Sequence, residues 1–215
     1  MLNLSLAELL KILPAILIGL TIHELAHAFI ALKLGDDTPK QLGRLTINPL
    51  KHIDLIGFIL LLVAGFGWAK PVVINKDKLK KPVRDDILIA VSGPLANLLL
   101  AFMLVVLLKL VLSFMPFRSR ATFELVVSIF LAFISINVSL GIFNLIPIPP
   151  LDGSHVILSL LSKRSATSAA IYFRYGSFAL LGLIILERIT RIEILPIGTV
   201  VNSVVTLFLR IVALS

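Results

Sequence analysis

Three long apolar runs constrain this chain more strongly than any other feature of its sequence. They cover residues 12–32, 87–115 and 125–146, and the few ionisable residues within them stand alone or in one short cluster. A helix needs about 20 predominantly apolar residues to cross the hydrocarbon core of a bilayer. Each run is long enough, so the sequence predicts a protein that crosses a membrane several times.

The overall composition agrees with a lipid environment. Apolar residues, counted with Tyr and Trp, make up 58% of the 215 residues, and charged residues make up only 15%. A soluble domain of this size could not bury so much apolar surface, because most residues of a small domain touch solvent. The length favours a single domain. We therefore expect one membrane-embedded domain over residues 1–215, with a core of about 6–161 and C-terminal helices within 168–214.

The remaining segments complete the predicted fold. Two weaker apolar runs, 171–186 and 195–214, bring the number of transmembrane helices to about five. The run 55–69 is uncharged but shorter than the minimum of about 17 residues for spanning, which predicts a re-entrant element. Residues 35–52 and 70–84 place Gly, Pro, Thr, Val and Ile in short pieces, a pattern typical of small strands and turns. The predicted fold is an all-α polytopic membrane protein with about five transmembrane helices, a re-entrant element and short membrane-proximal β-strands.

The formal net charge of +8 fits a membrane surface better than a nucleic acid. Most lysines and arginines lie between the apolar runs, and the sequence has no interleaving of basic and aromatic residues of the kind that binds single strands. If residues 55–69 do not cross, most of these basic residues share one side, which the positive-inside rule identifies as cytoplasmic. The predicted partner is thus the lipid bilayer with its anionic headgroups, and not nucleic acid.

One polar island interrupts the first apolar run, with His23, Glu24 and His27 inside the pentapeptide HELAH. On a helix, residues i and i+4 lie on one face a turn apart, so both imidazoles can bind one metal ion. The glutamate beside the first histidine can act as general base toward a water molecule that the metal activates. Ionisable residues inside a membrane are costly unless they have partners. The alternative is a polar trio that hydrogen-bonds between helices and binds no metal.

A catalytic zinc site needs a third protein ligand, and here it cannot be cysteine because the chain has none. The candidates are His52, Asp54, Asp152, His155 and other carboxylates. The proline-rich segment 147–150 ends the third apolar run, and irregular backbone at membrane depth is tolerated only where it lines a cavity or packs in protein. Asp152 follows at a turn, where it could bind a metal or cap a helix that begins near Ser154. For His52 we favour a hydrogen bond within a loop, and for His155 a position outside the ligand set.

Several segments together resemble the site-2 protease family of intramembrane zinc metalloproteases. They are HELAH at 23–27, SGPLAN at 92–97 and FNLIPIPPLDG at 143–153, while GRLTINPLKHID at 43–54 and GWAKPV at 67–72 are similar to the compact prokaryotic branch. The resemblance extends from about residue 19 to residue 158, and we expect neither the PDZ nor the CBS domain of other members. It implies an enzyme of the prokaryotic cytoplasmic membrane that hydrolyses peptide bonds in or near transmembrane segments of membrane-protein substrates. Its active site would be reached from the cytoplasmic side.

The resemblance also implies a role for each motif residue. One Zn²⁺ per chain would be held by His23, His27 and Asp152. Glu24 would be the general base. Asn97 would lie near the site and hydrogen-bond the substrate backbone or the developing oxyanion, unless it is only a polar contact between helices. Asn144 is expected to support the broken helix end.

Two other kinds of function fit parts of the sequence. A metal-binding membrane scaffold without enzymatic activity would keep the same ligands, and metal analysis combined with a cleavage assay separates it from a protease. A transporter could use intramembrane charges as an ion path, but it predicts inverted repeats and acidic residues in several spans, and the sequence offers neither. The natural substrate and the oligomeric state cannot be read from these residues.

Overall fold

Helices are the regular elements of the part of the chain that the structure describes, residues 5–64, 67–117, 119–190 and 192–214. In this computed structural model the long helices are α1 (Leu6–Leu34), α4 (Pro82–Phe114), α5 (Arg120–Asn144) and α7 (Ala166–Thr190). The shorter ones are α2 (Thr38–Gln41), α3 (Leu55–Ala64), α6 (Ser154–Arg164) and α8 (Ile197–Ile211), with 3-10 turns η1 (Pro49–Lys51) and η2 (Lys76–Lys78).

Four helices of the described residues, α1, α4, α5 and α7, are long and apolar enough to cross a membrane. This confirms the all-α, multi-pass architecture, with four helices of spanning length where about five were predicted. The fifth predicted span forms α8, and its 15 residues fall short of the minimum of about 17. The predicted re-entrant segment begins as α3, which has 10 residues. Residues 65–66 of that segment lie outside the described residues.

The β-strands predicted within residues 35–52 and 70–84 are absent from the described residues, where β-pairing is limited to one isolated antiparallel bridge. A strand persists only where a neighbouring backbone offers a continuous row of hydrogen-bond partners. In the first segment, α2 and η1 turn the chain before such a row can form. In the second, the N–H groups of Val72 and Asn75 donate to side-chain carboxylates of other segments. The short apolar pieces therefore cross the protein surface as irregular loops.

The helix that carries HELAH is fixed at both ends by its local sequence. At the start of α1, Ser5 and Glu8 exchange side-chain and backbone hydrogen bonds in a capping box. At its end, Gly35 adopts a φ of 111°, in the left-handed region that closes many helices. The 29-residue helix therefore holds His23 and His27 in its interior, well away from either fraying end.

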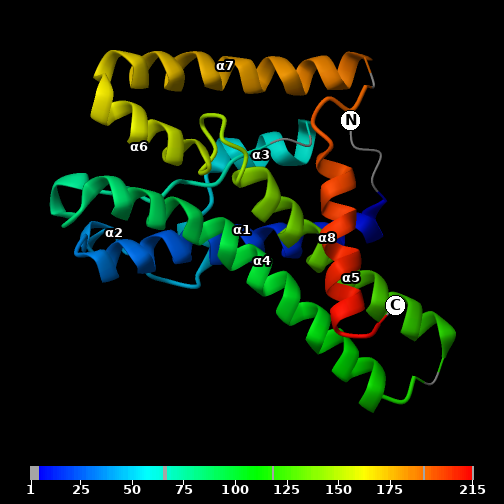
Figure 1. Cartoon of the computed structure of the whole chain (residues 1–215). Helices are drawn as coiled ribbons and strands as arrows, with labels where there is room; N and C mark the ends of the chain where they lie inside the picture. Colours follow the sequence, from blue (N-terminus) through cyan, green and yellow to red (C-terminus); the bar gives the residue numbers. More distant parts are fainter. Residues whose placement is uncertain (1–4, 65–66, 118, 191, 215) are drawn as a thin grey trace.

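Helices α1, α4 and α5 pack against one another, and α8 lies beside α4 and α5 (Figure 1). Ala101 and Val105 of α4 meet Ile134 and Val138 of α5 in a buried apolar cluster. Helices α6 and α7 form a second pair, and α7 lies along one edge of the molecule in Figure 1. Most of the α7 surface is exposed, as expected for a helix surrounded by lipid. The polar side chains described next are enclosed mainly by α1, α4 and the α5–α6 connection.

Candidate metal centre

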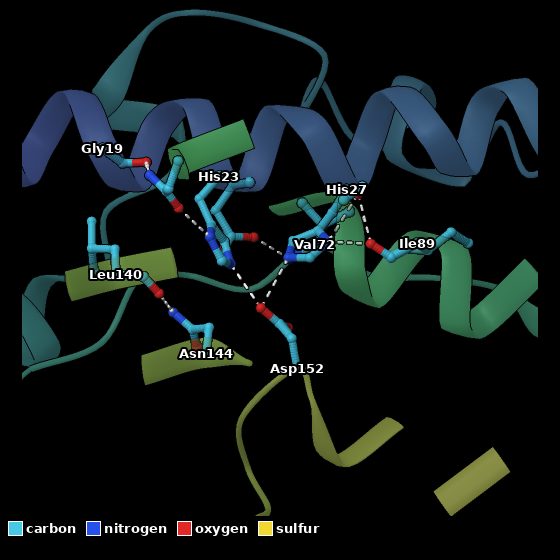
Figure 2. Close-up of polar contacts among 11 residues, drawn as sticks. Gly19, His23, His27, Val72, Ile89, Leu140, Asn144 and Asp152 are labelled. Atoms are coloured by element: carbon cyan, nitrogen blue, oxygen red, sulfur yellow. Dashed lines mark hydrogen bonds and ion pairs between the residues drawn. The ribbon is translucent and has the colours of Figure 1, made fainter. Parts of the chain in front are cut away.

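The two histidines of HELAH are buried, and both rings point toward the same carboxylate (Figure 2). The Nε2 atom of His23 lies 2.9 Å from Oδ2 of Asp152, and the Nε2 atom of His27 lies 3.4 Å from the same oxygen. One ligand atom from each residue falls within 4.8 Å of the others. The structure thus brings together all three side chains that the sequence predicts as metal ligands.

Asp152 reaches this position because the chain leaves α5 through a loop that closes on itself. The Gly153 N–H donates to the Asn144 carbonyl at 2.7 Å, which joins the end of α5 to the start of α6. A Cβ atom on residue 153 would lie 2.2 Å from the Leu145 carbonyl oxygen, so only glycine allows this approach. The Asn144 side chain bonds within its own helix, to the Leu140 carbonyl. The backbone of Asn144 therefore supports the broken helix end.

The orientation of each imidazole is set by an acceptor on α4. Nδ1 of His23 lies 2.7 Å from Oδ1 of Asn97, and Nδ1 of His27 lies 2.7 Å from the Ile89 carbonyl. Because both partners are acceptors, each Nδ1 carries the hydrogen and each Nε2 presents its lone pair to Asp152. Such an orienting bond to the distal ring nitrogen is usual for histidines that bind metals.

The donor set fits zinc. Two imine lone pairs and a carboxylate oxygen face one another without a hydrogen between them, an arrangement that requires a shared cation or additional protons. Zinc with nitrogen and oxygen ligands at about 2.0–2.2 Å in tetrahedral geometry places them about 3.3 Å apart, close to the two distances to Asp152.

Glu24 lines the same cavity as His27 and Asp152. This cavity has a volume of about 320 Å³ and is bordered by Glu24, His27 and Asp152 together with residues of the 71–76 loop and of α4. The Val72 N–H donates to Oε2 of Glu24 at 3.0 Å, which fixes the buried carboxylate against this loop. The predicted general base therefore lies beside the predicted ligands with a defined hydrogen-bond partner.

Arg44, which the sequence analysis did not single out, holds the loop that contacts Glu24. Its buried guanidinium donates to the carbonyl oxygens of Lys51, Lys70 and Pro71, the last at 2.7 Å. Burial lowers the pKa of Arg44, while the charge of Glu24 opposes this shift. Since Val72 directly follows Pro71, Arg44 fixes the segment that orients the glutamate.

Gly93 is the second residue missed from the sequence. A Cβ atom at this position of α4 would lie 2.4 Å from Nε2 of His27 and 2.7 Å from Nε2 of His23. The absence of a side chain is what allows α4 to pass directly beside both rings. The residue stands in the SGPLAN segment, but nothing in that segment indicates which helix it approaches.

The other candidate ligands lie outside the trio. His52 is buried in a loop, where its Nε2 donates to the Thr46 carbonyl at 2.8 Å. Asp54 accepts from the Gly57 N–H at the start of α3. His155 points to Asp86 of α4. None of these three hydrogen bonds involves the Asp152 carboxylate.

Asn97 has a different environment from the one expected of a residue that binds substrate. Its side chain is 0% exposed, and its Nδ2 donates both hydrogens, to the Gly19 carbonyl and to Oδ1 of Asn137. Its Oδ1 accepts from His23. Every polar atom of the amide is thus engaged within the protein, which favours a positioning role for Asn97.

Replacing Asn97 by Ala is expected to weaken zinc binding by about 10- to 100-fold, the usual cost of removing a group that orients a metal ligand. The measurement is competition for zinc with a chromophoric chelator, using the purified chain in detergent. His52→Ala, which removes a buried histidine outside the trio, is the control and should bind zinc like the wild type. Unchanged zinc affinity in N97A, combined with a lower kcat, would instead indicate direct contact with the substrate.

Comparisons with known proteins agree with this geometry. A family model described as Peptidase family M50 matches residues 11–125 and 113–184. A Bacillus subtilis protein named "Putative zinc metalloprotease YwhC" is 45% identical over 146 residues, which cover 68% of this chain and 67% of that protein.

Two further relatives carry the same description. Rip2 of Mycolicibacterium smegmatis is 31% identical over 180 residues, covering 81% of this chain and 66% of its own length. MJ0611 of Methanocaldococcus jannaschii is 34% identical over 157 residues, covering 72% and 73%. The chain thus spans about two thirds of the length of YwhC and of Rip2, and no solved structure matches it.

Proposed function

Because this chain belongs to peptidase family M50, the site-2 proteases, and is a zinc metalloprotease, we propose that it hydrolyses peptide bonds in or near transmembrane segments of membrane-protein substrates. The observation that carries this proposal is the convergence of two imidazoles and one carboxylate among helices of membrane-spanning length. We treat residues 1–215 as one metalloprotease domain, with a core of about 6–161.

The proposed chemistry assigns a task to each predicted site residue. Zinc held by His23, His27 and Asp152 would polarise a carbonyl and acidify a water molecule. Glu24 takes a proton from water in the cavity and delivers it to the leaving amine. The Val72 N–H keeps Glu24 in place for both transfers. Asn97 keeps the His23 ring in the orientation that turns Nε2 toward Asp152.

The substrate we propose is a transmembrane segment that has locally unwound. In an intact helix the carbonyl groups are already hydrogen-bonded along the helix and are shielded from attack. The cavity that holds Glu24 also has apolar walls, contributed by Ile74, Ile89 and Ala90. An extended apolar stretch of substrate can therefore enter next to the carboxylates, whereas a folded helix of about 10 Å diameter would not fit a volume of about 320 Å³.

We place the active site on the cytoplasmic side of the membrane. His27 lies six residues before Lys33, so the ligands sit about 9 Å from the end of the apolar part of α1. The same cavity is bordered by Lys76, in the basic segment between α3 and α4. The positive-inside rule assigns such segments to the cytoplasm. Helix α3 is about 15 Å long, too short to cross, which supports a re-entrant position for it.

The purified chain is expected to cleave a single-pass transmembrane peptide in detergent micelles, at a bond in or near its apolar segment. A zinc chelator should abolish cleavage and added Zn²⁺ should restore it, because no other side chains of the described residues form a comparable ligand group. Mass spectrometry of the products locates the bond. An unstructured soluble peptide of similar length serves as the control. Cleavage that persists after the metal has been removed, or that occurs only in the soluble peptide, would contradict the proposal.

A further inference from the structure

A second buried carboxylate, Asp86 in the first turns of α4, accepts hydrogen bonds from three donors on two other elements, η2 and α6. Its Oδ2 accepts from Lys76 Nζ at 2.8 Å, from Ser159 Oγ at 2.7 Å and from His155 Nδ1 at 3.2 Å. Asp86 is only 4% exposed. The proposed chemistry makes no use of this group, although it borders the same cavity as Glu24.

Two of these donors belong to the helix that follows the third ligand. His155 and Ser159 lie one turn apart on the same face of α6, and α6 begins two residues after Asp152. These two hydrogen bonds to one carboxylate fix the rotation of α6 about its own axis and its position along α4. The turn that presents Asp152 is therefore anchored on one side by the Gly153–Asn144 bond and on the other by Asp86.

Helix α4 thereby contacts all three predicted ligands or the element that carries them. Its Asn97 orients His23, its Ile89 carbonyl orients His27, and its Asp86 docks the helix adjoining Asp152. The first two contacts act on the rings directly. The third acts through α6 and sets the distance between the carboxylate and the two imidazoles.

We propose that Asp86 is a positioning residue of the metal centre, which holds Asp152 at ligand distance by docking α6 on α4. This inference rests on the proposed function, because it assumes that His23, His27 and Asp152 bind zinc. Asparagine at position 86 would preserve the volume but remove the negative charge, so that the single oxygen that accepts from Lys76, His155 and Ser159 becomes a neutral and weaker acceptor. It would also leave the Lys76 ammonium without its carboxylate partner.

Asp86→Asn is expected to weaken zinc binding by about 10- to 100-fold, as found when groups behind metal ligands are removed. Zinc affinity is measured by chelator competition on the full chain in detergent. The visible bands of the Co²⁺-substituted chain should also change, because they report the geometry of the ligand set. Ser159→Ala, a milder variant, should weaken zinc binding in the same direction but less, and the double variant should show that the two losses are not additive.

Asp85→Asn is the matched control. Asp85 is the neighbouring residue on α4 and is 0% exposed, but its carboxylate accepts from the Lys81 N–H and from Arg84 and makes no contact with α6. We expect D85N to bind zinc like the wild type. Equal losses in D85N and D86N would overturn the inference, because they would show a general weakening of α4.

The outcomes separate the two proposals. Wild-type zinc affinity and an unchanged Co²⁺ spectrum in both D86N and S159A would overturn the positioning role while leaving the proposed protease intact. A wild-type chain that binds no zinc would overturn the metal centre itself, and this inference with it.

Discussion

Replacing Glu24 by Gln is expected to lower kcat for a transmembrane peptide by about 10²- to 10⁴-fold, the usual contribution of a general base. Glutamine keeps the length of the side chain and can still accept from the Val72 N–H, but it cannot take a proton from water. It is not one of the three converging ligands, so the variant should retain one zinc per chain. Multiple-turnover cleavage at saturating peptide and metal analysis on the same preparation give both values.

The control for this variant is Glu8→Gln, in the first turn of the same helix. Glu8 is exposed and bonds only to the helix cap at Ser5, so its replacement should leave turnover unchanged. If E24Q turned over substrate at the wild-type rate, Glu24 could not be the base. If it lost its zinc as well, the loss of activity would reflect the metal and not proton transfer.

Replacing Gly93 by Ala is expected to remove zinc binding and turnover altogether. The new methyl carbon would lie 2.4 Å from Nε2 of His27 and 2.7 Å from Nε2 of His23, closer than any side-chain carbon can approach these atoms. Both rings would have to turn away from Asp152. Alanine favours a helix over glycine by about 1 kcal/mol, so α4 itself is not weakened by propensity. The measurements are zinc content and, on the metal-free chains, thermal unfolding, because bound zinc itself stabilises the folded state. We expect zinc content to fall in G93A while the unfolding of the metal-free chain is nearly unchanged.

Gly182→Ala in α7 is the matched control, since a Cβ atom there would meet nothing within 4 Å. This variant should bind zinc and cleave substrate like the wild type. A G93A chain that retained full zinc affinity would show that the rings bind metal with an orientation different from the one in Figure 2.

The fold could be predicted where the signal is local. Apolar runs identify α1, α4 and α5, because the length needed to cross a bilayer does not depend on the rest of the protein. The predicted strands failed because pairing depends on a partner segment, and the N–H groups of Val72 and Asn75 find carboxylates instead. The run at 195–214 predicts a span, but its helix has only 15 residues, because an apolar stretch does not reveal where its helix begins or ends.

The residues of the candidate site, too, could be predicted only where the signal is local. The i, i+4 spacing places His23 and His27 on one face whatever surrounds them. Family resemblance is needed to choose Asp152 among several candidates, since nothing local distinguishes a ligand from a helix cap. Arg44 and Gly93 could not be found at all. Their roles arise only where separate segments come close, Arg44 by bonding to three carbonyl groups and Gly93 by leaving room for two rings.

Because every predicted ligand depends on α4, a designer who wants to build this metal site into another protein must transfer more than the ligands themselves. A five-residue HELAH helix grafted into another bundle would carry two imidazoles without the acceptors that aim them, and preorganised sites fail when their supporting contacts are left to chance. The smallest portable unit is the pair of crossing helices α1 and α4 together with the Asn144–Gly153 loop and the first turns of α6.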